Sequence, residues 1–143
     1  MKKSHRMQIL VDLAKRKEDA AAQQLARDKA KVEQDVQKLD ELKEYAGQYE
    51  SERNLLGLGA YLTTNYQHFV DRVQQAILQQ EATIGRAEQQ ADMSMRGWLQ
   101  ARANTKSMDW LKEKNHKAEL MVEVKQEQRQ SDEFAMRRFL DRS

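Results

Sequence analysis

The side chains that could carry out chemistry in this sequence do not form a catalytic or metal-binding set. The three histidines, His5, His68 and His116, are scattered, and zero cysteines exclude disulfides, thiolate metal sites and a cysteine nucleophile. Gly57 and Gly59 lack the spacing and the following lysine of a phosphate-binding loop. The carboxylates stand among lysines and arginines at helix-surface spacing, which is typical of solvated pairs. We therefore expect no enzyme, no metal site and no cofactor.

Apolar and aromatic residues at helical spacing are more informative than the polar ones. With each residue advancing about 100° around a helix, two stripes lie beside the main apolar lines of the chain. They consist of Leu42, Tyr45 and Tyr49 in the first half and Phe69, Val73, Ala76 and Gln80 in the second. Two helices cannot by themselves bury both the main apolar line and the stripe beside it on each helix. The stripes therefore indicate either an aromatic cap over one end of the pair or a patch that binds a partner.

Basic residues concentrate at the start of the chain. Residues 1–17 hold six basic side chains and one acidic one, whereas residues 18–60 hold six basic and ten acidic ones. Such an end is typical either of a solvated helix terminus or of a surface that binds nucleic acid or an anionic partner. No interleaving of aromatic and basic residues and no known nucleic-acid module accompanies it.

The elements that must position these residues are expected to be long helices. The 143 residues include no proline, and only 39% are hydrophobic, which suits the two buried positions in seven of a coiled coil better than a compact globule. The glycines near position 58 interrupt the pattern, and Thr63, Thr64 and Asn65 are good N-cap types. We predict an all-α fold with one coiled-coil domain over residues 1–143, with helices at about 3–54 and 64–140 and a loop at about 55–63.

A seven-residue repeat on both sides of this loop supports the architecture. It consists of Leu25, Val32, Leu39 and Ala46, supplemented by Val36, and of Val70, Ile77, Ile84, Ala91 and Trp98, supplemented by Val73 and Ala87. A short connection makes such helices antiparallel neighbours in a left-handed supercoil, which predicts an elongated antiparallel coiled coil. Leu10, Leu13 and Ala21 lie in a shifted phase, and the four-residue offset into Leu25 predicts a stutter. The C-terminal part of the second helix would form an overhang of about 45–50 Å.

Neither a membrane span nor a secretion signal is expected. No stretch approaches the ~18 apolar residues that a membrane span requires. The mildly apolar segment Met7–Leu13 is interrupted by Gln8 and Asp12, and no small-residue cleavage site follows it. Together with the lack of cysteine, this pattern is typical of a cytoplasmic protein without direct membrane insertion.

Several pieces of the sequence occur in an order that is more specific than any one of them. They are Met7–Ala14, the Leu-x-x-Tyr-x-x-x-Tyr pattern of Leu42–Tyr49, the glycine-bearing loop with Tyr66–Phe69 after it, Ala76–Gln80, and Trp98 with Trp110 beyond it. In this order, over nearly its whole length, the chain resembles the flagellar type III export protein family FliJ.

The resemblance implies a non-catalytic stalk similar in shape to the coiled coil of the γ subunit of rotary ATPases. One end of the family's coiled coil enters the hexameric export ATPase FliI, and another portion contacts the cytoplasmic domain of the export-gate protein FlhA. Export chaperones and the ATPase regulator FliH are further implied partners, whereas nucleic acid is not. Such a protein would lie in the cytoplasm, peripherally associated with the inner-membrane export apparatus at the flagellar base.

The resemblance also implies two sets of site residues. Carried across to this sequence, the gate-contact surface of the family falls on Lys38, Leu42, Tyr45, Tyr49, Phe69, Val73, Ala76 and Gln80. Lys38 and Gln80 depart from the family pattern, which has an amide at the first position and can have a histidine at the second. For the ATPase ring, the candidates are basic and apolar residues near both termini, namely Leu10, Leu13, Lys15, Arg16, Lys17, Met136, Arg137, Arg138, Phe139 and Leu140.

Two other functions fit the same residues. One is a generic basic coiled-coil scaffold or a nucleic-acid-binding module, which the basic start of the chain would serve. The other is the equivalent stalk of a non-flagellar type III secretion system, because its shape would be similar.

Overall fold

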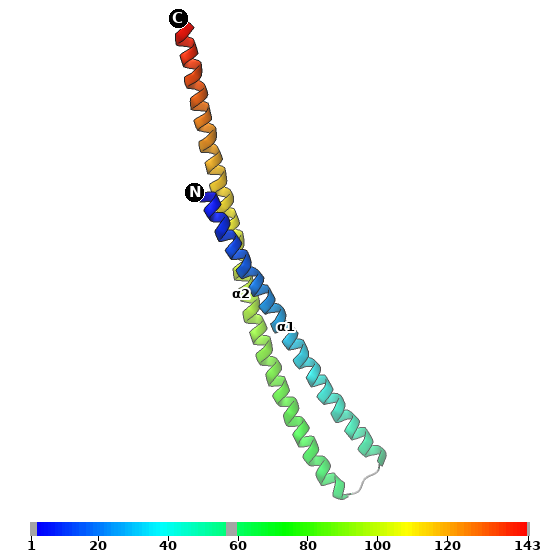
Figure 1. Ribbon diagram of the computed structural model, residues 1–143. Coiled ribbons are helices and arrows are strands. Elements are labelled where there is room, and N and C mark those ends of the chain that lie inside the picture. The colour runs from blue at the N-terminus through cyan, green and yellow to red at the C-terminus, as the bar shows by residue number, and fades with distance from the viewer. Residues whose placement is uncertain (1–2, 57–59, 143) are drawn as a thin grey trace. The chain divides into compact units, whose positions relative to one another are not determined.

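The backbone of the chain forms two long helices. The computed structural model describes residues 3–56 and 60–142, with side chains described at 3–54 and 65–142. Helix α1 spans Lys3–Leu56 and helix α2 spans Ala60–Arg142 (Figure 1). Every described residue is helical, and the two helices pack against each other. The predicted all-α fold of two long helices is confirmed.

Both helices extend closer to the glycines than the sequence pattern predicts. α1 continues to Leu56, and α2 begins at Ala60. Thr63, Thr64 and Asn65, the residues expected at the start of the second helix, therefore lie within the bounds of α2. A chain without proline loses no backbone donor near this point, so helical hydrogen bonding can continue toward the glycines. Residues 57–59, the centre of the predicted loop, lie outside the described residues.

The chain divides into two compact units, each of which pairs part of α1 with part of α2. Unit 1 contains residues 1–19 and 99–143, and unit 2 contains residues 20–98. In unit 2, Asp28 accepts a hydrogen bond from Ser94, and the carbonyl of Asp35 accepts one from Gln80. Because the partner's number falls as the number in α1 rises, the helices of this unit are antiparallel, as the cyan and green ribbons of Figure 1 show.

Burial along each helix follows alternating steps of four and three residues, as a coiled coil requires. On α1 the buried and half-buried positions include Met7, Val11, Ala14, Glu18, Ala21, Leu25, Asp28, Val32, Asp35, Leu39, Leu42, Ala46, Tyr49 and Arg53. On α2 they include Tyr66, Val70, Val73, Ile77, Gln80, Ile84, Ala87, Ala91, Ser94, Trp98, Ala101, Thr105, Met108, Lys112, Asn115 and Glu119. We call the line through Leu25 and Ile77 the first seam line and the line through Leu42 and Val73 the second seam line.

The core along this seam is thin. Val11, Ala14, Leu25 and Leu39 are the buried hydrophobic side chains of the described part of the chain, and most other seam positions are half-buried. Val36, which we expected to supplement the seam, is 39% exposed. It follows Val32 by four residues, whereas the seam takes its next step at Asp35. The four-residue step carries Val36 out of the contact.

The predicted stutter near the start of α1 is wrong. Val11 and Ala14 are 0% and 4% exposed, whereas Leu10 and Leu13 are 44% and 48% exposed. The alternation of four and three therefore continues from Met7 to Leu25 without interruption. Leucine is the larger side chain, but the heptad phase set by the partner helix selects the smaller neighbours for burial.

Charges beside the seam of unit 2 suit an antiparallel pair. Lys29 and Lys43 flank the first seam line on α1, and Glu81 and Glu88 flank it on α2. Residues at these flanking positions lie on the same side of an antiparallel pair, so opposite signs favour this pairing over two basic or two acidic flanks.

In unit 1 the start of α1 is held by an acidic side chain of α2. The first turn of α1 contains no acidic residue. Glu119 accepts hydrogen bonds from the backbone N–H of Ser4 at 3.1 Å and from the Ser4 hydroxyl at 2.6 Å. The carboxylate thereby satisfies a backbone donor at a helix N-terminus and complements the helix dipole.

Beyond this contact α2 continues as an overhang. Every described residue after Glu119, from Leu120 to Arg142, is exposed. At 1.5 Å per residue this exposed stretch measures about 35 Å, somewhat less than the overhang that we predicted. The difference arises because α1 reaches Glu119, further along α2 than the count from the loop indicates.

Candidate partner-binding sites

Aromatic side chains of both helices gather in unit 2 near the ends that face the glycines. We call Tyr45, Tyr49, Tyr66 and Phe69 the aromatic cluster. The ring of Tyr49 lies with its centroid 3.9 Å from Phe69 and 5.8 Å from Tyr66, and it stacks almost parallel on Tyr66 at 6°. Tyr45 contacts Phe69 edge-on, with centroids 5.8 Å apart and an angle of 65°. Each aromatic contact joins one helix to the other.

A cation extends this cluster. The guanidinium carbon of Arg53 lies 3.8 Å from the centroid of the Tyr66 ring, within the range of a cation–π interaction. Arg53 occupies the first seam line and is half-buried. Its apolar stem can therefore pack along the seam while its charged end lies on the ring.

The cluster combines features of both interpretations of the stripes. The rings pack against one another, as an aromatic cap would. Tyr45 nevertheless remains 55% exposed, and Tyr49, Tyr66 and Phe69 are only half-buried. A partner could therefore reach ring surface without opening the helix pair.

The eight residues that the family resemblance assigns to gate contact share one side of the helix pair. We call Lys38, Leu42, Tyr45, Tyr49, Phe69, Val73, Ala76 and Gln80 the gate face. Leu42, Tyr49, Val73 and Gln80 lie on the second seam line, and the other four directly flank it. In an antiparallel pair the flanks of this line adjoin across the seam. The structure thus brings all eight residues to one surface of unit 2.

The expectation that the stripes lie beside the buried lines is wrong for four of their residues. Leu42, Tyr49, Val73 and Gln80 are half-buried seam residues. An antiparallel coiled coil buries two lines of side chains on each helix, whereas the sequence pattern suggested one dominant line. What remains outward on the gate face is Lys38 and Tyr45, which are exposed, and the edges of half-buried side chains.

Gln80 also has a structural contact within the pair. Its side-chain Nε2 donates a hydrogen bond to the backbone carbonyl of Asp35 at 2.8 Å. The Asp35 side chain is 1% exposed, and its Oδ1 accepts a hydrogen bond from Lys31 Nζ at 3.0 Å. Its Oδ2 is buried without a hydrogen-bond partner. A carboxylate thus occupies a seam position next to the gate face.

A second acidic seam residue lies one heptad earlier on α1. The hydroxyl of Ser94 donates to Asp28 Oδ2, and Gln24 Nε2 donates to Asp28 Oδ1 at 3.1 Å. The hydrogen bond from Ser94, followed by that from Gln24, lowers the pKa of Asp28 below its ordinary value. Asp28 is therefore held in its charged form within the seam.

The candidate residues for ATPase-ring binding lie in unit 1 in two separate stretches. Leu10, Leu13, Lys15, Arg16 and Lys17 are exposed on α1, where α2 runs alongside. The second stretch is exposed on the overhang, where Met136, Phe139 and Leu140 are 66%, 74% and 62% exposed, together with Arg137 and Arg138. Met136 lies about 25 Å along α2 beyond Glu119, so the two stretches follow each other in tandem.

The overhang also contains an aromatic residue that our sequence reasoning missed. Phe134 is 63% exposed, and the guanidinium carbon of Arg138 lies 5.6 Å from its ring centroid. The four-residue spacing on a helix surface is the signal that could have identified this pair. The same four-residue spacing separates Arg53 from Tyr49, and Tyr66 precedes Phe69 by three residues, about one helical turn.

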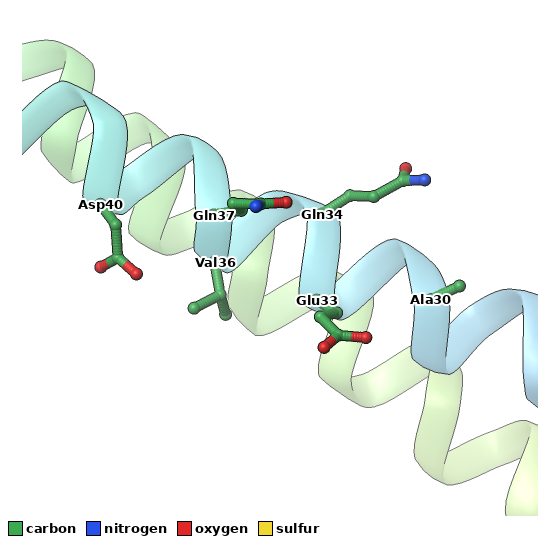
Figure 2. A pocket seen from close by; sticks show the side chains of 6 residues that line it. All are labelled: Ala30, Glu33, Gln34, Val36, Gln37 and Asp40. Atoms are coloured by element: carbon green, nitrogen blue, oxygen red, sulfur yellow. The ribbon is translucent and has the colours of Figure 1, made fainter.

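An open groove on α1 is lined by carboxylate, amide and apolar side chains. Figure 2 shows the groove, which measures about 430 Å³. The residues that line it all come from α1, namely Ala30, Glu33, Gln34, Val36, Gln37 and Asp40. The lining contains none of the gate-face residues.

Metal-binding groups and membrane spans do not occur in the described part of the chain. Over residues 3–56 and 60–142, no three histidine or acidic residues come together to hold a metal ion. Within the same ranges, neither helix has a stretch long and apolar enough to cross a membrane.

Comparisons with known proteins show the family of the chain. The family model described as flagellar FliJ protein matches residues 2–143. The flagellar FliJ protein of Salmonella typhi is 27% identical over 134 residues, which cover 92% of this chain and 91% of that protein. The flagellar FliJ protein of Escherichia coli (strain K12) is 27% identical over 131 residues, which cover 90% and 89%. Because the family model spans nearly all residues, the chain belongs to the flagellar FliJ family, whose members serve flagellum biogenesis and protein export.

Proposed function

We propose that the chain is a non-catalytic coupling component of the flagellar type III export apparatus. In this role it joins the hexameric export ATPase FliI to the cytoplasmic domain of the gate protein FlhA and takes part in handling export chaperones, with FliH as a further partner. It works in the cytoplasm at the flagellar base, peripherally associated with the inner-membrane apparatus. Family membership supports the flagellar system over a non-flagellar one.

The gate face carries this proposal. Its eight residues share one side of unit 2, and Tyr45 offers a half-exposed ring at the edge of a packed aromatic cluster. An aromatic side chain held by its neighbours is the kind of anchor that contributes most to protein–protein affinity. Lys38, exposed on the same side, supplies a positive charge that suits an acidic patch on the partner.

The exposed residues of unit 1 support contact with the ATPase ring. Basic groups on both stretches can steer the chain toward an acidic pore, although each solvent-exposed charge contributes little by itself. Retention then depends on apolar contacts, for which Met136, Phe139 and Leu140 on the overhang are well exposed.

Binding of the full chain to the purified cytoplasmic domain of FlhA tests the proposal. Tyr45→Ala and Phe69→Ala should each weaken binding by about 1–3 kcal/mol, as expected for aromatic anchors, while most of the helix content is retained. Leu78→Ala is the matched control, because Leu78 is 65% exposed on α2 away from the seam and its flanks. If Tyr45→Ala and Phe69→Ala bind as tightly as Leu78→Ala, the gate face does not bind the gate.

A further inference from the structure

The contacts of the aromatic cluster form one continuous series. The side chains follow the order Tyr45, Phe69, Tyr49, Tyr66 and Arg53, and each contact crosses from one helix to the other. On α1 the members are four residues apart, and on α2 they are three apart. Both spacings keep a side chain on one face of a helix, so the series follows from heptad geometry.

Tyr49 is the central member of the series. It contacts Phe69 at 3.9 Å and Tyr66 at 5.8 Å between ring centroids. A ring that packs against two rings of the other helix cannot change its orientation without moving one of them. The orientation of Tyr49, and through it that of Phe69, therefore depends on Tyr66.

Arg53 stands at the other end of the series from Tyr45. Its guanidinium carbon lies 3.8 Å from the Tyr66 ring centroid, so the cation covers a ring that would otherwise meet water on that side. A guanidinium is planar and weakly hydrated, which makes it better suited than an ammonium group to lie on an aromatic face.

We propose that Tyr66 and Arg53 are positioning residues of the gate face. Arg53 holds Tyr66, Tyr66 holds Tyr49, and the packed rings present Phe69 and the half-exposed Tyr45 to the partner in a fixed orientation. Fixing these side chains before binding reduces the conformational entropy that the complex must lose. The inference rests on the proposed contact between the gate face and the cytoplasmic domain of FlhA, and adds two residues to it.

The test uses the full chain, with binding to the FlhA cytoplasmic domain measured well below the melting temperature of every variant. Tyr66→Leu removes the ring and keeps apolar volume, and Tyr66→Phe keeps the ring. Arg53→Met removes the guanidinium and keeps the stem. Arg72→Met is the matched control, because it removes the same charge from an exposed arginine of α2 outside the series. The near-ultraviolet circular dichroism of the tyrosines reports ring order independently of binding.

We expect Tyr66→Leu to weaken binding about 5- to 15-fold and Arg53→Met about 2- to 5-fold, magnitudes typical of aromatic and cation–π contacts. Both should reduce the tyrosine dichroism. Tyr66→Phe and Arg72→Met should stay within about twofold of the unchanged chain, since neither removes a ring or its cation. Recovery of affinity in Tyr66→Phe would assign the effect to the ring.

The contrary outcomes are distinct. If Tyr45→Ala weakens binding while Tyr66→Leu and Arg53→Met bind normally, the two residues do not position the gate face, and the proposed function stands. If the unchanged chain does not bind the FlhA domain, the proposed function fails and the inference fails with it. Should Tyr66→Leu not fold, Arg53→Met decides, because it leaves all four rings in place.

Discussion

The side chain of Gln80 on α2 reaches across the seam to the backbone of Asp35 on α1, with 2.8 Å between Nε2 and the carbonyl oxygen. The carboxylate of Asp35 lies in the same seam, 1% exposed, with only Oδ1 bound by Lys31. Buried polar groups of this kind reduce stability but favour one register of a coiled coil over others. Asp35 is therefore expected to lower the stability of the helix pair while favouring one register.

Replacing Asp35 by leucine should stabilise the chain. The change removes a buried oxygen that lacks a hydrogen bond and adds apolar contact at a seam position, while Lys31, whose side chain is 55% exposed, stays solvated. We expect the free energy of unfolding to rise by about 1–3 kcal/mol in urea titrations. Asp40→Leu, on the exposed surface of α1, is the control and should give no such gain. A loss of stability in Asp35→Leu would show that the Lys31–Asp35 pair is net stabilising.

The hydrogen bond between Ser94 and Asp28 should make the free energy of unfolding depend on pH. Because the folded-state pKa of Asp28 lies below its ordinary value near 3.8, its charged form stabilises the fold above about pH 4, and this contribution is lost as the pH falls through the lowered pKa. Ser94→Ala should lower the melting temperature at pH 7, and the difference from the unchanged chain should shrink toward pH 2–3. An undiminished difference at low pH would mean that Ser94 acts through packing instead. Asp28→Asn should remove the pH dependence of the Ser94→Ala effect.

The side chain of Glu119 should stabilise the first turns of α1. Glu119→Ala removes the acceptor of both Ser4 hydrogen bonds at an N-terminal turn that contains no acidic residue of its own. We expect a loss of about 0.5–2 kcal/mol, the range of N-cap substitutions, with faster amide exchange confined to the first turns of α1. Glu127→Ala, on the exposed overhang, is the control. Uniform exchange rates along α1 in both variants would contradict the proposed capping role.

The two ring-binding stretches should affect different rate constants. Replacing Lys15, Arg16 and Lys17 together by glutamine should slow association with the FliI hexamer and flatten its salt dependence, because exposed charges act through a field screened over ~8 Å at physiological salt. Truncation after Ser131 removes the apolar residues at 136, 139 and 140 and should speed dissociation. Surface plasmon resonance at two salt concentrations separates these effects. Kinetics that are indifferent to salt and to the truncation would place the ring contact elsewhere.

Two glycines offer a simple gain in stability. Gly47 and Gly97 lie inside helices, are exposed, and have no atom within 4 Å of the position that a Cβ would occupy. Gly47→Ala and Gly97→Ala should each stabilise the chain by about 0.5–1 kcal/mol in thermal melts, because alanine loses less backbone entropy in a helix. Ala103→Gly, at an exposed position of α2, should cost a similar amount. If neither glycine variant melts higher, helix propensity does not limit stability at these positions.

The helical architecture could be predicted from the sequence because its causes are local. The absence of proline and the spacing of residues such as Leu25 and Ile77 determine long helices and a heptad repeat without knowledge of the partner. The exact ends of the helices could not be predicted in this way. Thr63 and Thr64 have the chemistry of an N-cap, but nothing in the preceding residues forces the helix to begin there.

The phase of the seam near the N-terminus could not be predicted without knowing how the second helix packs. Leu10 and Leu13 are more hydrophobic than Ala14, so hydrophobicity alone predicts burial of the wrong residues. The polar contacts in the seam could not be predicted for the same reason. Asp28 and Asp35 read as surface carboxylates until Ser94 and Gln80 are placed opposite them. The gate-face residues came from spacing and resemblance, whereas the roles of Tyr66 and Arg53 follow from the contact of Tyr66 with Tyr49 and that of Arg53 with Tyr66.

The alternating contacts from Tyr45 to Arg53 also bear on how the helix pair of unit 2 responds to force. Sliding α1 along α2 would shift every ring against its neighbours at once, so the contacts share the load. Pulling the helices apart sideways would break the contacts one after another, each at low force. The same five side chains therefore make this region stiff in shear and weak in peeling, and a motion transmitted along the helices would meet the stiffer direction.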